Sequence, residues 1–287
     1  MILNLRNLNL YTNKIHFKMD TLNTIIKLVE KDCFMASIDW KDAYYSVPIA
    51  KSDRKYLRFL WKGKLYQFTC LPNGLSCGPR KFTKLLKPAL TELHLKGHIS
   101  SGYIDDLYLQ GKTYDDCVHN VIDTVIQFDT LGLVTYPEKS AFIPFQQLVI
   151  LGFVLNSVTM TITLTQEKAI SLQNACTTLL NTASPTIREV ARVLGKIVSS
   201  FPGVMYGALY YRHIEHDKTC ALRTNRWNFD SHMALSASCK CDLEWRTANV
   251  MTAKNVLTRE QPSCELTTDA SNEGWGAVYG TWSTEGL

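Results

Sequence analysis

Apolar residues recur along the chain with two different periods, and these periods predict a mixture of helices and strands. Spacings of three and four residues predict helices at about 19–29, 78–96, 115–131, 166–181 and 186–200. Short apolar runs and alternation predict strands at 2–5, 34–39, 56–59, 63–69, 148–155, 158–164 and around 266–280. Residues 200–261 show neither period, so we expect an irregular segment there.

Carboxylates interrupt the apolar pattern where predicted strands end. Asp39 closes the run FMASID, and Asp105 and Asp106 lie where two short apolar runs meet in a predicted hairpin. An acidic pair in apolar surroundings repels itself and gains nothing from packing, so a bound cation explains it. Taken alone, this pair fits metal binding and a plain hairpin turn equally well.

A second acidic pair offers an internal comparison. Asp115 and Asp116 follow Lys112 and Thr113 and open a predicted helix. Carboxylates are favourable at a helix N-terminus because the helix dipole is positive there. We therefore predict a structural role for this second pair.

Composition excludes several classes of protein. The 287 residues are 46% hydrophobic and 20% charged, which is globular rather than disordered and long enough for about two domains. The chain has no apolar run of membrane-spanning length, and its first residues do not resemble a signal peptide, so we expect no membrane association and an intracellular location. Nine cysteines without C-x-x-C spacing favour reduced thiols over disulfides or a zinc ribbon.

Charge is distributed unevenly along the chain. Residues 1–98 contain 17 basic and 7 acidic side chains, whereas residues 99–287 contain 14 and 19. Basic residues are dense at 51–64 and 80–87. These runs fit a surface that faces phosphates, and they fit a merely solvated basic face equally well.

Five blocks follow one another in a recognisable order. They are SIDWKDAYYSVPI (37–49), LPNGLSCGPRKF (71–82), YIDD (103–106), GLVTYPEKS (132–140) and ILGFVLNS (150–157). The series resembles the palm motifs of retrotransposon reverse transcriptases. With HFKMDTL (16–22) near the start and TDASNEGWGA (268–277) near the end, DIRS-type elements are most similar and gypsy-type elements next. The resemblance implies an α+β right-hand polymerase, whose antiparallel palm sheet carries helices on one face. Such an enzyme extends a primer with deoxynucleoside triphosphates on an RNA or DNA template.

The resemblance assigns the catalytic and triphosphate-binding roles by motif. Asp39, Asp105 and Asp106 would be the catalytic ligands of two Mg²⁺ or Mn²⁺ ions, which prefer hard oxygen donors. Backbone amides from Trp40, Lys41, Asp42 and Ala43 would face the triphosphate.

Further roles concern the sugar, the leaving group and the primer. Tyr44 resembles the steric gate that excludes a ribose 2′-hydroxyl, although Tyr44 and Tyr45 also fit an ordinary aromatic core. Asn73 stands where many relatives have glutamine, and Lys139 resembles a lysine that assists pyrophosphate release. The remaining segment, Leu151, Gly152 and Phe153, resembles the primer grip.

The same resemblance divides the chain into four parts. Residues 1–162 would form partial fingers and the palm, 163–200 a thumb-like helical region, 201–261 a connection, and 262–287 the start of an RNase H-like domain. Asp269 would be the first carboxylate of that last domain. We expect truncation of both the fingers and the RNase H-like domain, and no RNase H activity.

Two other functions remain open on the sequence alone. A non-catalytic retroelement remnant would retain only nucleic-acid binding. An RNA-dependent RNA polymerase would share the palm carboxylates but is disfavoured by Tyr44 and the RNase H-like tail. The sequence does not indicate an oligomeric state.

Overall fold

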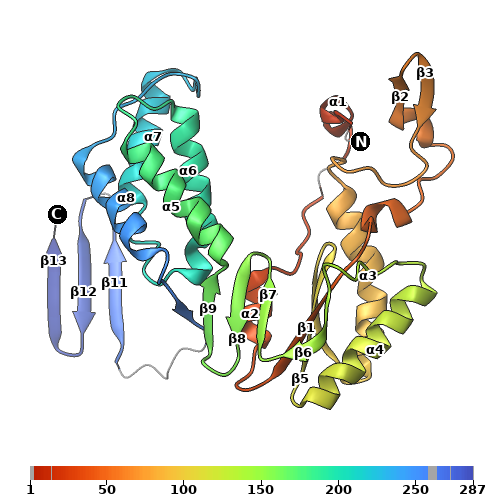
Figure 1. The fold of residues 1–287 in the computed structure, drawn as a ribbon. Helices are drawn as coiled ribbons and strands as arrows, with labels where there is room; N and C mark the ends of the chain where they lie inside the picture. The colour runs from red at the N-terminus through yellow and green to blue at the C-terminus, as the bar shows by residue number, and fades with distance from the viewer. Residues whose placement is uncertain (1–2, 14, 258–263, 272, 287) are drawn as a thin grey trace.

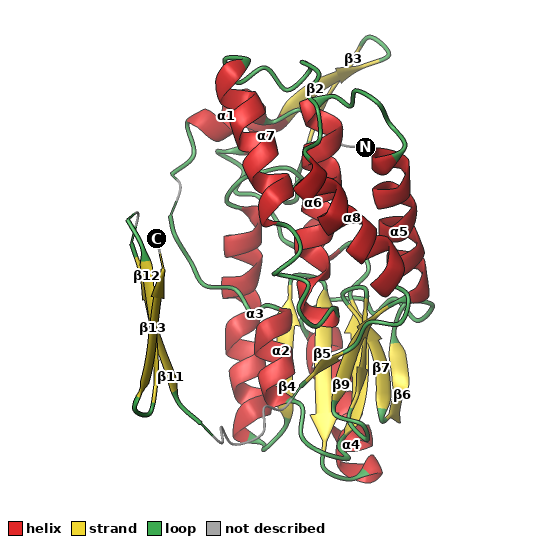
Figure 2. Cartoon of the chain, turned by 90° about the vertical axis from the view of Figure 1, so that its left-hand side faces the viewer, coloured by secondary structure: helices red, strands yellow, loops and turns green. Residues whose placement is uncertain are grey.

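The computed structural model describes residues 3–13, 15–257, 264–271 and 273–286. Two central sheets lie side by side, and the helices α5–α8 and the β2–β3 hairpin rise from opposite ends of them (Figure 1). Figure 2 shows the same helices standing above the strands.

The first sheet is a four-stranded antiparallel sheet. Its strands lie in the order β4 (Ile99–Tyr103), β5 (Asp106–Gly111), β1 (Phe34–Asp39) and β6 (Ala141–Phe145). The predicted strand at 34–39 is confirmed. So is the α+β class, because these strands combine with helices that are separate from them in the chain.

Both faces of this sheet are buried. Helices α3 (Gly78–Leu95) and α4 (Tyr114–Thr130) cover one face, where Phe82, Leu107 and Phe128 are buried together. Met35 and Tyr108 point to the other face, because side chains alternate along a strand. There they share a core with α2 (Leu22–Leu28) and with the second sheet.

The β2–β3 hairpin is shorter than predicted. β2 (Arg58–Trp61) and β3 (Lys64–Gln67) pair around Lys62 and Gly63, whose φ angles of 46° and 74° suit a tight hairpin turn. The preceding residues form the 3₁₀ helix η2 (Arg54–Leu57) instead of a strand. The strand predicted at 2–5 is wrong over 3–5, which precede helix α1 (Arg6–Leu10), and Ile2 lies outside the described residues.

The second sheet contains a hairpin that the sequence pattern merged into one strand. Its order is β10 (Asn255–Val256), β9 (Thr161–Leu164), β8 (Phe153–Asn156) and β7 (Gln147–Ile150). The predicted strand at 148–155 is two strands, because Leu151 and Gly152 take φ angles of 50° and 75° and reverse the chain. Gly152 adopts that angle without the strain that a Cβ atom causes.

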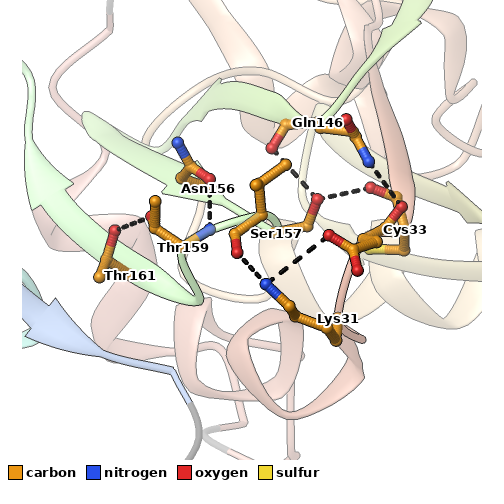
Figure 3. A network of polar contacts seen from close by, with 9 residues as sticks. Lys31, Cys33, Gln146, Asn156, Ser157, Thr159 and Thr161 are labelled. Carbon is orange, nitrogen blue, oxygen red and sulfur yellow. Dashed lines mark hydrogen bonds and ion pairs between the residues drawn. The ribbon is translucent and has the colours of Figure 1, made fainter.

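A polar network ties the start of β1 to the β8–β9 turn (Figure 3). The buried Ser157 hydroxyl lies 2.6 Å from the Cys33 carbonyl oxygen, to which it donates, and 3.2 Å from the Gln146 carbonyl oxygen. The Asp32 amide donates back to the Ser157 carbonyl oxygen at 3.1 Å. These bonds hold the two sheets together at the end of β1 that is remote from Asp39.

Four helices pack over the second sheet. They are α5 (Gln166–Leu180), α6 (Ile187–Ser200), α7 (Arg212–Thr224) and α8 (Ala237–Asn249). The helices predicted at 166–181 and 186–200 are confirmed. The irregular structure expected for 200–261 is wrong where α7 and α8 form, and residues 258–261 lie outside the described residues. Ile214 of α7 and Leu243 of α8 share one buried core with Leu172 and Ile197.

The chain ends in a separate antiparallel sheet of β11 (Leu266–Ala270), β12 (Trp275–Tyr279) and β13 (Trp282–Gly286). The strand pair predicted there is confirmed, and β13 extends it. All nine cysteines lie within the described residues as free thiols. Among the described residues, we find no helix with the length and apolar character of a membrane span.

Candidate active site

Neighbouring strands bring the predicted metal ligands to one end of the first sheet. The antiparallel register of β1 and β5 places Asp39 directly opposite Asp106. Asp105 lies in the tight turn between β4 and β5, where Ile104 has a φ angle of 56°. The Trp40 amide donates to the Asp105 carbonyl oxygen at 3.0 Å, so this turn is fixed to the end of β1.

The segment at 134–140 is bound to the same strand end. The Tyr136 amide donates to the Asp39 carbonyl oxygen at 2.8 Å, and the Asp39 amide donates to the Ser140 hydroxyl at 3.0 Å. This brings Lys139 to the carboxylates, and its ammonium group also lies 4.8 Å from the centre of the Tyr136 ring. These hydrogen bonds therefore position the Lys139 ammonium near Asp39, although the two residues are far apart in the sequence.

Burial and mutual repulsion raise the pKa of two of the aspartates. Burial is the largest cause for Asp39, where Lys139 partly reverses the rise and Asp105 adds to it. For Asp106, burial followed by the charges of Asp105 and Asp39 raises the pKa to about 6. Each of these carboxylates is stabilised by gaining either a proton or a nearby cation.

The donor set fits a hard divalent cation. Mg²⁺ takes oxygen ligands and keeps several waters, so two or three carboxylates at one strand end suffice. No group of three His, Cys, Asp or Glu side chains in the described part of the chain is gathered closely enough to hold an ion. The three aspartates therefore do not form a closed cage of ligands, although their charges contribute to the raised pKa values of Asp39 and Asp106.

A cavity of about 390 Å³ opens beside these carboxylates. Asp39 and Asp105 line it, whereas Asp106 does not. Every substrate-binding residue predicted from the sequence also lines it: Trp40, Lys41, Asp42, Ala43, Tyr44, Asn73 and Lys139. Tyr136 and Ile104, which the sequence motifs did not single out, complete this wall with Tyr45.

Tyr44, the predicted steric gate, and its neighbour Tyr45 both belong to η1 (Ala43–Ser46), which follows β1. The Tyr44 ring meets Phe82 edge-on at 5.3 Å, and burial followed by the Asp105 charge raises the pKa of Tyr44 to about 12. The Tyr45 ring lies 6.3 Å from Phe68. Since both tyrosines line the cavity, neither is only a core residue.

The predicted primer grip forms the turn between β7 and β8. Leu151 and Gly152 make the turn, and Phe153 is buried behind it. Lys168 of α5 was not singled out from the sequence, yet its ammonium lies 3.8 Å from the centre of the Phe153 ring and donates to the Ser199 carbonyl oxygen at 3.3 Å. Burial lowers the pKa of Lys168. The sequence did not indicate this contact, because Lys168 is one lysine in a predicted helix and lies far from Phe153 in the chain.

Asp269 lies outside this site. It is an exposed residue of β11 and pairs with Gly276 of β12 in the C-terminal sheet. Glu273 and Glu285 line the same shallow depression. The structure therefore brings Asp269 together with neither the palm carboxylates nor the predicted primer grip.

Comparisons with known proteins show similarity to reverse transcriptases and to transposon polyproteins. Residues 1–155 match the family described as reverse transcriptase (RNA-dependent DNA polymerase). The Transposon Tf2-3 and Tf2-7 polyproteins of Schizosaccharomyces pombe are 21% and 20% identical to this chain over 142 residues. Each match covers 50% of this chain and 10% of the relative, so the chain spans about a tenth of these relatives.

Solved structures share the fold over nearly the whole chain. The foamy viral protease-reverse transcriptase dRH in complex with double-stranded DNA has a TM-score of 0.72 and 21% identity, covering 97% of this chain and 46% of that chain. The same viral protein with an RNA/DNA hybrid has a TM-score of 0.70 and 20% identity, covering 97% of this chain and 35% of that chain. The matched motifs and the shared fold lead to one conclusion: the chain belongs to the reverse transcriptase (RNA-dependent DNA polymerase) family of nucleotidyltransferases.

Proposed function

We propose that this chain is the polymerase part of a retroelement polyprotein and extends a primer on an RNA or DNA template with deoxynucleotides. The observation that carries the proposal is the cavity that joins Asp39 and Asp105 to Tyr44, Asn73 and Lys139. The complexes of the foamy viral protein with double-stranded DNA and with an RNA/DNA hybrid support nucleic acid as the partner. The segments HFKMDTL (16–22) and TDASNEGWGA (268–277) support a DIRS-type element as the source.

Asp39, Asp105 and Asp106 would hold the metal. Two Mg²⁺ or Mn²⁺ ions, when bound, make a primer 3′-hydroxyl nucleophilic and neutralise the triphosphate. Burial of Asp39 and Asp106 supports this role, because both carboxylates are stabilised by a nearby positive charge.

The other cavity residues would bind and select the nucleotide. The amides of Trp40 and Lys41 already donate to the Asp105 and Val134 carbonyl oxygens, so the expectation that they face the triphosphate is wrong for these two. The amides of Asp42 and Ala43 would face the triphosphate, and Lys139 would supply a positive charge for the departing pyrophosphate. The ring of Tyr44 would occupy the space that a ribose 2′-hydroxyl needs. Asn73 reaches the same cavity with a side chain one methylene shorter than glutamine.

The rest of the chain would hold the primer and the duplex. The turn at Leu151 and Gly152 would face the primer end as the primer grip, with Phe153 as its buried support. Residues 1–162 would form the palm with partial fingers and 163–200 the thumb-like region. Residues 201–261 would form the connection and 262–287 the start of an RNase H-like domain. Asp269 would be a carboxylate of the last part.

Primer extension on matched RNA and DNA templates tests the proposal. We expect deoxynucleotide addition that a chelator abolishes and that Mg²⁺ or Mn²⁺ restores. A non-catalytic remnant would instead show salt-sensitive binding of the template–primer without any extension. That result, obtained with folded protein, would refute the proposed activity.

A further inference from the structure

Lys168 lies where three elements meet: the turn between β7 and β8, helix α5, and the end of helix α6. Its side chain passes close to Gly152, where an added Cβ atom would lie 3.3 Å from the Lys168 Cδ atom. Its ammonium lies 3.8 Å from the centre of the Phe153 ring and donates to the Ser199 carbonyl oxygen at 3.3 Å. One side chain of α5 therefore contacts both the predicted primer grip and the last turn of α6.

The start of α5 is itself bound to the same turn. The Thr165 amide donates to the Gly152 carbonyl oxygen at 3.3 Å. Thr165 is also the N-cap of α5, and its hydroxyl accepts from the Lys168 amide at 3.4 Å. Figure 1 shows α5 rising directly from the end of β9. Because side chains in a helix tilt toward its N-terminus, Lys168 is directed back to the turn at Leu151 and Gly152.

The segment that ends α6 packs on the ring of Phe153 as well. The 3₁₀ helix η3 (Phe201–Gly203) follows α6 directly. An added Cβ atom at Gly203 would lie 3.2 Å from the Cδ1 atom of Phe153, which is closer than ordinary van der Waals contact. Phe153 is only 4% exposed. The ring thus contacts α5 through Lys168 and the end of α6 through η3, so its position depends on both helices.

The charge of Lys168 is met by the elements that it joins. None of the ion pairs among the described residues includes Lys168. The ammonium instead faces the negative π-face of Phe153 and a carbonyl oxygen at the negative end of the α6 dipole. An uncharged side chain of similar length would lose both interactions. The connection between the turn and α6 therefore depends on the ammonium group.

We propose, on the basis of the polymerase function above, that Lys168 is a positioning residue that holds the predicted primer grip in place relative to α5 and α6. Through Gly152 and Phe153 it would fix where the primer 3′ end lies relative to Asp39 and Asp105. Lys168 does not line the cavity, so it would act on the reaction only through the turn. Small displacements of reacting atoms slow a reaction strongly, which makes the rate of addition a sensitive measure of this role.

Single-nucleotide primer extension by Lys168→Met tests the role, because methionine keeps an apolar stem and lacks the ammonium. We expect kcat to fall by about tenfold or more, while KM for the nucleotide stays within about twofold. Lys168→Arg keeps the charge and should retain most of the rate. Melting curves of each variant verify that the fold is intact.

Lys196→Met is the matched control. Lys196 of α6 also joins the two helices, since its ammonium donates to the Ser171 hydroxyl at 2.9 Å, but this contact does not involve the primer-grip turn. Its kcat should match that of the wild type. Equal losses in Lys168→Met and Lys196→Met would overturn the inference, because any lysine between α5 and α6 would then serve. An unchanged kcat in Lys168→Met would overturn it as well.

The salt dependence of template–primer binding separates positioning from a direct contact with a phosphate. Loss of one phosphate contact flattens the slope by about 0.9 log unit per log salt. A positioning residue leaves the slope unchanged. A flatter slope in Lys168→Met than in Lys196→Met would therefore overturn the inference and make Lys168 a ligand of the nucleic acid.

Hydrogen exchange measures the hold on the turn without requiring activity. Lys168→Met should make the amides of Gly152 and Phe153 exchange severalfold faster, and Lys196→Met should not. Unchanged exchange in a chain that extends primers would overturn the inference and leave the polymerase function standing. Faster exchange in a chain whose wild type does not extend primers would refute the polymerase function, and with it the role of Lys168 at the primer, and leave only its hold on the turn.

Discussion

At the scale of single residues, Tyr44 and Tyr45 are adjacent in the chain yet have different surroundings. Tyr44 packs on Phe82, and the Asp105 charge contributes to its raised pKa, so it lies within electrostatic reach of that carboxylate. Tyr45 lies against Phe68, on the side of the cavity that leads to the hairpin. This difference supports Tyr44 as the residue that contacts the sugar.

Replacing Tyr44 with valine should therefore relax sugar selection. The smaller side chain removes the overlap with a 2′-hydroxyl, so ribonucleotide incorporation should increase by about tenfold or more, with a smaller loss of deoxynucleotide use. Tyr45→Val should lower stability without changing sugar choice. The measurement is the ratio of kcat/KM for matched deoxy- and ribonucleotides. A ratio that shifts with Tyr45 alone would show that the motif is misplaced by one residue.

The raised pKa of Asp106 predicts that, in the absence of metal, the charged Asp106 carboxylate lowers the free energy of unfolding, and that this effect depends on pH. The folded state holds this proton up to about pH 6, whereas an unfolded aspartate releases it near its ordinary value of 3.8. Between these values the folded state binds more protons, so its stability falls as pH rises. Asp106→Asn should therefore be more stable than the wild type above pH 6, by about 1–2 kcal/mol after solvent screening.

Thermal or urea unfolding in a chelator, compared at about pH 4 and pH 7, measures this effect. The difference between Asp106→Asn and the wild type should be small at the lower pH and largest at the higher pH. A difference that is constant with pH would mean that the carboxylate charge is not what destabilises this strand end.

At the scale of elements, the segment leading into the β2–β3 hairpin carries the exposed cations Lys51, Lys55 and Arg58. Neutralising Lys51, Lys55 and Arg58 together should weaken template–primer binding. Each lost phosphate contact reduces the salt slope by about 0.9, so the slope should flatten by up to about three log units per log salt. The measurement is the dissociation constant over a series of salt concentrations.

A matched triple provides the control for this experiment. Lys31 precedes β1, Lys96 follows α3 and Lys112 follows β5, so all three lie at the end of the first sheet remote from Asp39. Neutralising them should leave the slope unchanged. Equal flattening by both triples would mean that the basic residues act only through net charge.

Helices with apolar stripes could be predicted from the sequence, and those with buried polar groups could not. The stripe of α6 predicted its bounds closely, and in the structure Thr186 and Glu189 form a capping box at its start. In α8, Asp242 and Arg246 are buried at 4% and 0% exposure, and the guanidinium donates to the Gly207 carbonyl oxygen at 2.7 Å. Charged residues at inward positions hide the helical period, which is why 200–261 was expected to be irregular.

At the scale of the whole molecule, the candidate site depends on contacts that short sequence windows do not contain. The resemblance to palm motifs assigned Asp39 and Asp106 to one site, and the structure pairs the last residue of β1 with the first residue of β5 in register. Tyr136 and the bonds of the 134–140 segment could not be predicted, since they depend on how that segment crosses the end of β1. The contact of Lys168 with Phe153 likewise joins a helix to a separate hairpin.

The two acidic pairs provide the sharpest test of the proposed polymerase site. Each consists of two adjacent aspartates, but the two pairs have different surroundings. Asp115 and Asp116 open α4, where the Asp116 side chain accepts from the Thr113 amide at 3.1 Å, so the structural role predicted for that pair is confirmed. Asp105 lies instead on the cavity wall beside Asp39. The measurement is primer extension by Asp105→Asn and Asp115→Asn proteins whose melting curves show an intact fold. We predict that Asp105→Asn abolishes extension and that Asp115→Asn leaves it nearly unchanged. Equal loss in both, or extension that survives in Asp105→Asn, would show that the polymerase site is not at the strand end that carries Asp39 and Asp105.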